Sequence, residues 1–219
     1  MTLKKKFKLG VLVDDNGLTP DQLAFLNLIL AEHEIFYHPL LIRVKPARAA
    51  QVKYFQAPVP GHFQALKLTL GRLILEMIRK LEISKIQRIP KYSDYGTIKA
   101  FPEQWEILAA EVQAGDANNR LTFTQESRSA IAGMNLDLLL NLTSIHMNDS
   151  AQGLSRLGLM YCHYGDNRSF RGDPMGFWEV YLDSPASGFT IQLQEEGAAA
   201  STVLYRGNIS TEPYWIFNL

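Results

Sequence analysis

The feature that most constrains the fold of this chain is a capped helix placed directly after a short apolar strand near its start. Residues 9–13 form a run rich in Val and Leu, which predicts a buried strand. Thr19, Pro20 and Gln22 then mark a helix start, because Thr caps a helix, Pro suits its first position and Gln can reach back to the cap. The apolar face that follows is broad, so this helix should pack on a sheet.

A second strand is expected at 35–44, after a helix that runs to about His33. Strand, helix and strand in this order form a βαβ unit, whose strands lie parallel with a right-handed crossover. We therefore predict an α/β protein with a Rossmann-like, doubly wound and mostly parallel sheet. Its 219 residues, 47% of them apolar, suit a single domain over residues 1–219 with one well-buried core.

The middle of the chain is predicted to be an irregular insertion at about 46–115, because prolines recur through it. Within it, apolar spacing indicates a long helix at about 63–81 and a short helix from 103 to about 113. Further strands are expected at 121–123, 136–142, 157–162, 189–194 and 202–206, and helices at 125–134 and 174–182. The 189–194 strand alternates apolar and polar residues, which is typical of an antiparallel strand with its polar face in water.

The charge balance excludes some classes of partner. The 22 basic and 22 acidic residues cancel, so no global field draws the chain to nucleic acid or anionic lipid. The apolar stretch after the basic start is short, so neither a signal peptide nor a membrane span is expected. A lone cysteine, Cys162, rules out an internal disulfide, and we expect a cytoplasmic protein.

Two cofactor classes are also not expected. His33, His38 and His62 do not make metal-ligand spacing with one another or with Cys162, so no metal is predicted. No Gly-rich phosphate loop follows the first strand, since the acidic segment 14–17 would repel a pyrophosphate. That segment argues against a nicotinamide dinucleotide.

The densest polar cluster follows directly on the 157–162 strand. It combines an imidazole, carboxylates, guanidinium groups and a carboxamide: His163, Tyr164, Gly165, Asp166, Asn167, Arg168, Arg171, Gly172 and Asp173. In open parallel sheets, ligands bind beyond the carboxyl ends of the strands, where loops carry polar groups. The cluster is therefore our first candidate site. The alternative is a plain turn at 165–167 whose neighbouring arginines pair with acids.

On these residues the chain resembles the catalytic domain of the folate-dependent formyltransferases. In that family a strand ends in Asn-x-His-Pro-Ser, continues Leu-Leu-Pro and closes on an aromatic residue followed by Arg-Gly. His163 falls on the family's His, and Phe-Arg-Gly at 170–172 falls on the aromatic-Arg-Gly at the same spacing. Residues 187–191 resemble the family's Thr-Gly-Val-Thr-Ile strand, and 195–197 resemble its Asp-Glu-Gly.

The similarity is closer to a bacterial group of formyltransferase-like domains with His-x-Gly-Asp-Asn-Arg, then Arg-Gly, then Gly-Phe-Trp-Glu. Residues 163–168, 171–172 and 176–179 reproduce these motifs. Such domains often precede a sugar-transferase-like region similar to plant sphingolipid glucosamine transferases. The resemblance therefore implies the formyltransferase fold, and it implies that the chain is the first module of a protein with a sugar-transferase domain downstream.

The resemblance also implies a reaction. The family moves a one-carbon formyl group from 10-formyltetrahydrofolate to an amine, and the acceptor here would be a small-molecule amine or an amino sugar. His163 would be catalytic, Asn167 would stand in for the family's Asn, and Asp166, Asp173 or Glu196 would act as base, with Asp166 taken as catalytic.

Binding roles follow from the same resemblance. The acceptor would be held by three residues of the cluster, namely Arg168, Arg171 and Gly172. The folate pteridine contacts backbone after the preceding strand in the family, which assigns folate binding to Thr143, Ser144, Ile145 and His146. For this last segment, an ordinary loop is the alternative.

Two of the three catalytic positions of the family are replaced. Tyr161 stands at the Asn position and Ala199 at the Asp position. Losing one oxyanion donor costs about 10²–10³ in rate, so this degenerate site predicts a slow, altered or absent reaction. The alternative is a non-catalytic formyltransferase-like module that binds a ligand and acts with a neighbouring transferase domain or a partner.

Overall fold

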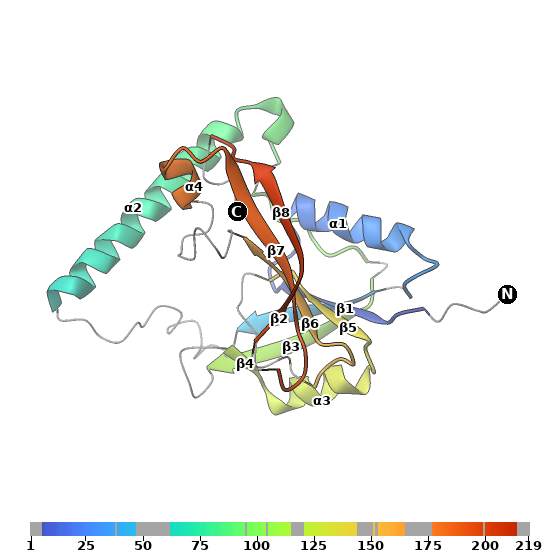
Figure 1. Ribbon diagram of the computed structural model, residues 1–219. Helices are drawn as coiled ribbons and strands as arrows, with labels where there is room; N and C mark the ends of the chain where they lie inside the picture. Colours follow the sequence, from blue (N-terminus) through green and yellow to red (C-terminus); the bar gives the residue numbers. More distant parts are fainter. Residues whose placement is uncertain are drawn as a thin grey trace. The chain divides into compact units, whose positions relative to one another are not determined.

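A computed structural model describes residues 6–37, 39–46, 62–94, 96–103, 105–114, 121–143, 151, 153–164, 177–198 and 200–213 (Figure 1). In chain order the elements are β1 (Leu9–Asp14), α1 (Pro20–Ala31), β2 (Leu40–Pro46), α2 (His62–Ile86), a 3-10 turn (Pro90–Tyr92), β3 (Ile107–Ala114), β4 (Leu121–Phe123), α3 (Gln125–Gly133), β5 (Leu138–Asn141), β6 (Leu159–Tyr164), α4 (Phe177–Tyr181), β7 (Ala186–Gln194) and β8 (Thr202–Ser210).

The strands of the described residues form one sheet in the order β4-β3-β2-β1-β5-β6-β7-β8. β1 is parallel to β2 and to β5, β3 is parallel to β2, and β6 is parallel to β5. β4 is antiparallel to β3, and the carboxyl-terminal strands are antiparallel as well. The predicted α/β class with a mostly parallel sheet is confirmed.

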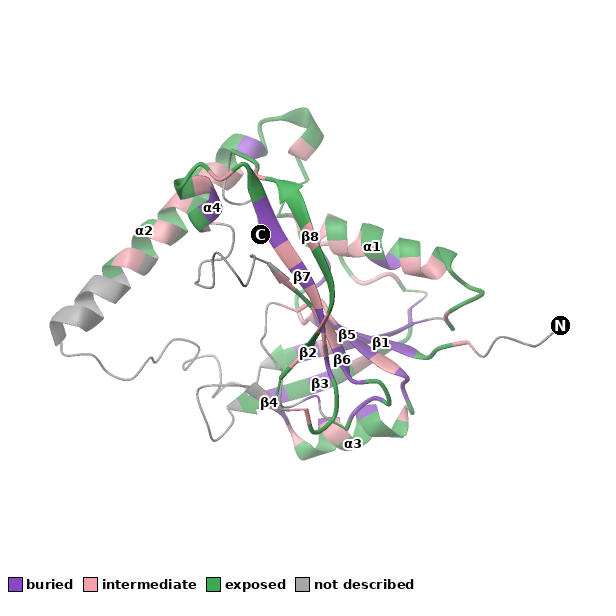
Figure 2. Cartoon of the chain, in the orientation of Figure 1, coloured by how far each residue is buried: buried purple, intermediate pink, exposed green. Residues whose placement is uncertain are grey.

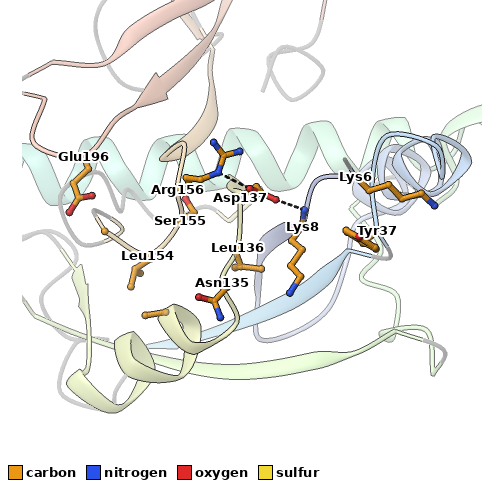
Figure 3. A pocket seen from close by; sticks show the side chains of 12 residues that line it. Lys6, Lys8, Tyr37, Asn135, Leu136, Asp137, Leu154, Ser155, Arg156 and Glu196 are labelled. Atoms are coloured by element: carbon orange, nitrogen blue, oxygen red, sulfur yellow. Dashed lines mark hydrogen bonds and ion pairs between the residues drawn. The ribbon is translucent and has the colours of Figure 1, made fainter. Parts of the chain in front are cut away.

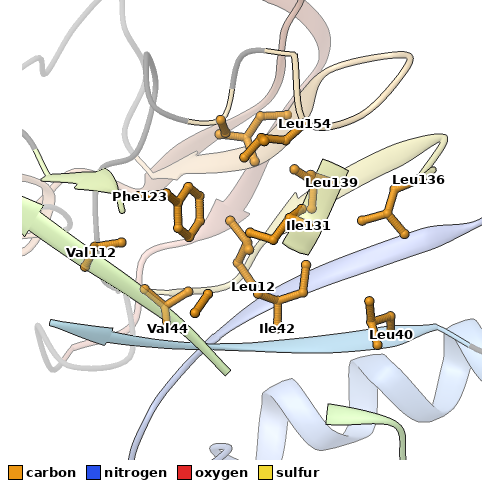
Figure 4. Packing of buried hydrophobic residues seen from close by; sticks show 13 residues of the cluster. Leu12, Leu40, Ile42, Val44, Val112, Phe123, Ile131, Leu136, Leu139 and Leu154 are labelled. Carbon is orange, nitrogen blue, oxygen red and sulfur yellow. The ribbon is translucent and has the colours of Figure 1, made fainter. Parts of the chain in front are cut away.

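Helices α1 and α3 cover opposite faces of the parallel strands. Successive strand residues point to opposite faces, so β1 contributes to two apolar clusters. Val11 and Val13 pack in one cluster with Leu26 of α1, whereas Leu12 packs in the other with Ile131 of α3 (Figure 4). All five side chains are fully buried, and Figure 2 shows most of β1 as buried. The doubly wound arrangement is therefore confirmed.

The start of α1 has the structure that its sequence predicts. Thr19 Oγ1 accepts the Gln22 N–H at 3.2 Å, and Gln22 Oε1 accepts the Thr19 N–H at 2.9 Å. Pro20 is the first helical residue. The Gln22 side chain also donates its Nε2–H to the Leu142 carbonyl at 2.8 Å, which ties the helix start to the chain leaving β5.

The helix predicted from 103 to about 113 is wrong, because most of that segment is strand β3. β3 pairs with β2 along its length, from Ile107 opposite Leu41 to Val112 opposite Pro46. Ala110 and Val112 lie two residues apart on one strand face, and both are buried against β2 and β4. Burial at this sheet position outweighs the helix propensity of an Ala-rich segment.

The second strand also begins later than predicted. β2 starts at Leu40, and in the segment before it Phe36 makes an isolated parallel bridge with Phe7. The strands at 121–123, 136–142 and 157–162 and the helix at 125–134 are found within a few residues of their predicted bounds. The helix expected at 174–182 is observed as Phe177–Tyr181, and its first residues lie outside the described ones.

By its internal contacts the chain divides into two compact units, one from 1–55, 98–162 and 192–203, the other from 56–97, 163–191 and 204–219. The first unit holds both apolar clusters. The second unit exposes a stripe of large apolar side chains on α2: Leu70, Leu73, Ile74, Met77 and Leu81. Within the described residues, no helix is both long enough and apolar enough to cross a membrane.

Candidate functional site

The strand order reverses between β1 and β5. From β1 the chain continues to β2 and β3 on one side, and β5 and β6 lie on the other side. Such a reversal is where open α/β sheets bind ligands, beyond the carboxyl ends of the strands. β5 and β6 are neighbours with Asn141 opposite Tyr161. The segment predicted to bind folate, which begins at Thr143, therefore follows β5. The predicted catalytic segment, which begins at His163, lies at the end of the adjacent parallel strand β6.

Of the predicted site residues, the structure describes His163, Thr143 and the candidate base Glu196, which is exposed just after β7. His163 is half-buried on β6, two positions after Tyr161, and strand residues two apart share a face. Cys162, between them, is exposed. The other predicted site residues lie outside the described ones: Asp166, Asn167, Arg168, Arg171, Gly172, Ser144, Ile145 and His146, as does the replaced position Ala199.

The described part of the predicted folate segment is already hydrogen-bonded within the protein. Asn141 Oδ1 accepts both the Thr143 N–H at 2.9 Å and the Thr143 hydroxyl at 2.7 Å. The neighbouring Leu142 carbonyl accepts from Gln22. The Thr143 N–H and hydroxyl and the Leu142 carbonyl are therefore already hydrogen-bonded within the protein.

Tyr161, which stands at the family's Asn position, lies in a polar cluster with residues from β7 and the chain before β8. Its hydroxyl is 2.5 Å from Ser201 Oγ and 3.0 Å from Gln192 Oε1. Ser201 Oγ in turn donates to Gln194 Oε1 at 2.8 Å, and Gln194 Nε2 donates to the Ala198 carbonyl at 2.8 Å. We call Tyr161, Gln192, Gln194 and Ser201 the tyrosine cluster.

The donors and acceptors of the tyrosine cluster can be assigned by starting from the Ala198 carbonyl. The Ala198 carbonyl can only accept, which orients the Gln194 amide and makes its Oε1 the acceptor of the Ser201 proton. Ser201 then has no proton for Tyr161, so the single Tyr161 proton is donated to Gln192 Oε1 or to Ser201 Oγ. The phenol proton is therefore used inside the cluster in either case, and Tyr161 cannot donate to another acceptor without breaking such a bond.

The polar side chains of β7 are buried, contrary to the sequence expectation. Thr190, Gln192 and Gln194 are 1%, 8% and 6% exposed, whereas the apolar residues between them are only half-buried. The alternation along the strand is present as predicted, but the polar face, which was predicted to face water, is the buried one. The reason lies in the hydrogen bonds of the tyrosine cluster, which satisfy the Gln192 and Gln194 amides inside the protein.

Glu179 is a further candidate for a functional residue, because it is a buried acid. The motif that contains it does not indicate this burial. It closes the Gly-Phe-Trp-Glu motif, lies on α4 and has only 2% of its surface exposed. Buried carboxylates are costly and are retained mainly where a partner or a function requires them. For metal ions, the described residues contain no group of three or more His, Cys, Asp or Glu side chains that could bind one.

The chain is similar to solved structures of formyltransferases at low identity. Phosphoribosylglycinamide formyltransferase from Bacillus halodurans is 12% identical, with 93% of this chain and 80% of that one covered and a TM-score of 0.47. Glycinamide ribonucleotide transformylase 1 from Geobacillus kaustophilus is 11% identical, with 95% and 85% covered and a TM-score of 0.47. Formyltetrahydrofolate deformylase from Burkholderia mallei is 9% identical, with 99% and 60% covered and a TM-score of 0.49.

No protein-family model matches the sequence, and no curated protein matches it either. Structural similarity at TM-scores below 0.5 does not by itself define a family. The class of protein that the chain's own residues define is an α/β protein with a mostly parallel, doubly wound sheet and polar segments after adjacent strands.

Proposed function

We propose that the chain is a transferase of the formyltransferase type, which moves a formyl group from 10-formyltetrahydrofolate to an amine of a small molecule such as an amino sugar. The observation that carries this proposal is the pairing of Asn141 with Tyr161 on adjacent parallel strands. The formyltransferase-like motif begins at the end of one of these strands, and the segment assigned to folate begins at the end of the other.

In the proposed reaction the acceptor nitrogen gains the formyl carbon and loses a proton, and the folate nitrogen gains a proton. When bound, the folate supplies the formyl group. His163 donates a hydrogen bond to the oxygen on which negative charge develops, because the Tyr161 proton is already donated to Gln192 or Ser201. Asn167 is the second donor and Asp166 is the base, while Arg168, Arg171 and Gly172 hold the acceptor.

The folate contacts in this proposal involve mainly Ser144, Ile145 and His146. Thr143 contributes less, since its N–H and hydroxyl are bound to Asn141. The acceptor is an amino sugar supplied or used by a downstream sugar-transferase-like domain, and the protein acts in the cytoplasm.

The first test is a calorimetric titration with 5-formyltetrahydrofolate, a stable analogue of the donor. We expect the unmodified protein to bind it and His163→Ala to bind it about tenfold more weakly, a change of about 1.4 kcal/mol. The matched control is His33→Ala, which removes an exposed histidine just after α1 and should leave binding unchanged. Failure of the unmodified protein to bind the analogue would contradict the folate proposal.

The second test restores the missing carboxylate. Ala199→Asp should raise the rate of formyl transfer to amino sugars, measured as formamide product by mass spectrometry, since a base at this position serves the family reaction. A matched Ala199→Asn variant should not raise it. An equal rate in the unmodified protein, Ala199→Asp and Ala199→Asn would mean that the chain does not use the mechanism of the formyltransferase family.

A second candidate function is a non-catalytic binding module. It is favoured by the hydrogen bonds of the Tyr161 hydroxyl, which are made to other side chains of the protein. At the position where the family has a catalytic donor, this chain therefore has a residue with a structural role. Folate binding without any transfer, in the unmodified protein and in Ala199→Asp alike, would support this module over the enzyme.

A further inference from the structure

The chain that leaves β5 starts from the middle of the sheet. Asn141, the last residue of β5, lies opposite Leu12 of β1 on one side and Tyr161 of β6 on the other. The strand order reverses between β1 and β5, and ligands of open α/β sheets bind at such a reversal. The conformation of the residues just after Asn141 therefore sets how the chain enters the candidate site.

The Asn141 side chain holds Thr143. Its Oδ1 accepts the Thr143 N–H at 2.9 Å and the Thr143 hydroxyl at 2.7 Å. A backbone N–H can only donate, so the oxygen of the Asn141 amide, and not its nitrogen, faces Thr143. A side-chain oxygen that accepts the N–H two residues further on makes an Asx turn. Asn141 thus bends the chain directly after the strand and fixes the Thr143 side chain.

Leu142, between these two residues, is held by two other segments. Its N–H donates to the Leu12 carbonyl at 3.0 Å, and its carbonyl accepts the Gln22 Nε2–H at 2.8 Å. Its side chain packs against the apolar cluster under α1. Both backbone polar groups of Leu142 are therefore bonded within the protein, one to β1 and one to α1.

The Gln22 amide has its orientation fixed by the cap of α1. The Thr19 N–H can only donate, so Gln22 accepts it with Oε1, at 2.9 Å. The amide nitrogen then points to Leu142, which lies 120 residues away in sequence. One side chain therefore caps the helix and also holds the chain leaving β5.

The segment that supports Gln22 is itself anchored. Leu18 and Lys99 exchange two backbone hydrogen bonds, at 2.7 and 3.1 Å. Gly17 has a φ of +123°, and a Cβ there would overlap the Lys99 carbonyl. The Gly17 N–H donates to the Asp14 carbonyl at 3.3 Å. The start of α1 is thus a fixed support for the Gln22 side chain.

We propose, on the basis of the proposed function, that Asn141 and Gln22 are positioning residues for the formyl donor. They hold Leu142 and Thr143 in one geometry before any ligand binds. Ordering a chain segment on binding costs free energy that is lost from the affinity, and this part of the cost is already met in the free protein. Asn141 acts through Thr143, and Gln22 acts through Leu142.

The test is calorimetric titration of the whole chain with 5-formyltetrahydrofolate, at a temperature where circular dichroism shows every variant to be folded. We expect Asn141→Ala to bind about tenfold more weakly than the unmodified protein, because the start of the segment is no longer held. Asn141→Asp keeps an acceptor oxygen for the Thr143 N–H and hydroxyl. It should restore most of the affinity.

Two variants of Gln22 separate positioning from capping. Gln22→Glu keeps an acceptor for the Thr19 N–H but has no donor for the Leu142 carbonyl, whereas Gln22→Ala loses both bonds. Both should bind the analogue about fivefold more weakly, and only Gln22→Ala should also lose the return bond of the cap. A merely structural role of Gln22 would leave the affinity of Gln22→Glu unchanged.

The matched control lies at the opposite end of the same strand. Asp137, just before β5, accepts the Lys8 N–H at 3.0 Å and the Arg156 Nε–H at 2.8 Å (Figure 3). Asp137→Ala removes these bonds and so lowers stability without changing the chain that leaves β5. It should bind 5-formyltetrahydrofolate like the unmodified protein.

The outcomes distinguish this proposal from the proposed function. If the unmodified protein does not bind 5-formyltetrahydrofolate, the folate function is contradicted, and the positioning role with it. If the unmodified protein binds, and Asn141→Ala and Gln22→Glu bind as tightly, the positioning role alone is overturned. It is also overturned if Asp137→Ala weakens binding as much as Asn141→Ala does, because lowered stability would then explain both losses.

Discussion

The tyrosine cluster and a second cluster, in which Asp137 accepts the Lys8 N–H and the Arg156 Nε–H and which we call the aspartate cluster, both join segments that are distant in sequence. They differ in which hydrogen-bond donors they leave available. In the tyrosine cluster the Tyr161 and Ser201 protons are used inside the cluster. In the aspartate cluster Asp137 is satisfied, while Arg156 and Lys8 keep donors that border a cavity. A polar group at a strand end is therefore available to a ligand only if its hydrogen bonds are not already made within the protein.

The largest expected effect comes from Gly158, which lies between the two clusters in sequence. Its φ is +108°, and a Cβ there would overlap the Gln194 carbonyl. We expect Gly158→Ala to lower the free energy of unfolding by about 3 kcal/mol, because strain and overlap add. Urea denaturation measures it. Gly133→Ala is the control, since a Cβ there meets nothing within 4 Å, and its stability should hardly change.

Asp137→Ala should have the next largest effect. It leaves the Lys8 N–H without its acceptor and the Arg156 guanidinium without its carboxylate, which we expect to cost about 2–3 kcal/mol of stability. Asp137→Asn retains an acceptor and should cost less. Equal losses in the two variants would show that the charge of Asp137, rather than its hydrogen bonds, stabilises the fold.

Tyr161→Phe tests whether the tyrosine cluster is structural. Removing the hydroxyl takes a hydrogen-bond partner from both Ser201 and Gln192, so we expect a loss of about 1–2 kcal/mol. Ser201→Ala should cost a similar amount, and the double variant should cost less than the sum, because both changes remove the same bond. Strictly additive losses would mean that the two hydroxyls do not interact in solution.

Gln22→Ala should give the smallest effect of the four. It removes the return bond to the Thr19 N–H and the bond to the Leu142 carbonyl, both partly exposed, and we expect a loss of about 0.5–1 kcal/mol. Thermal unfolding followed by circular dichroism measures it. Thr19→Ser, which keeps a capping hydroxyl, should be nearly neutral. A larger loss in Thr19→Ser than in Gln22→Ala would contradict the capping assignment.

Much of the fold could be predicted from sequence where local signals and burial agree. The helix start at Thr19 was predictable because its hydrogen bonds join residues three apart. Strand β3 was not, because an Ala-rich segment is helical by propensity and becomes a strand only beside β2. The same holds for β7. Its alternation could be predicted from the sequence, but the face that is buried depends on the neighbouring strands and could not be predicted.

The candidate site was predictable only in part. The resemblance located His163 and the replacement at Tyr161, since motifs depend on residue type and order. It could not show that Tyr161 bonds Ser201 and Gln192, which are 40 and 31 residues away in sequence. Asp137 lies within the strand predicted at 136–142, and nothing local in the sequence indicates that Lys8 and Arg156 converge on it.

The bond between the Lys8 N–H and the Asp137 carboxylate has a consequence for the order of folding. It joins residues 129 apart in sequence, next to the pairing of β1 with β5. Loop closure over such a separation is slow compared with forming the neighbouring β1-α1-β2 unit. The edge of β1 that pairs with β5 must therefore stay unpaired during synthesis until β5 has been made, which leaves an apolar strand edge open to aggregation in the nascent chain.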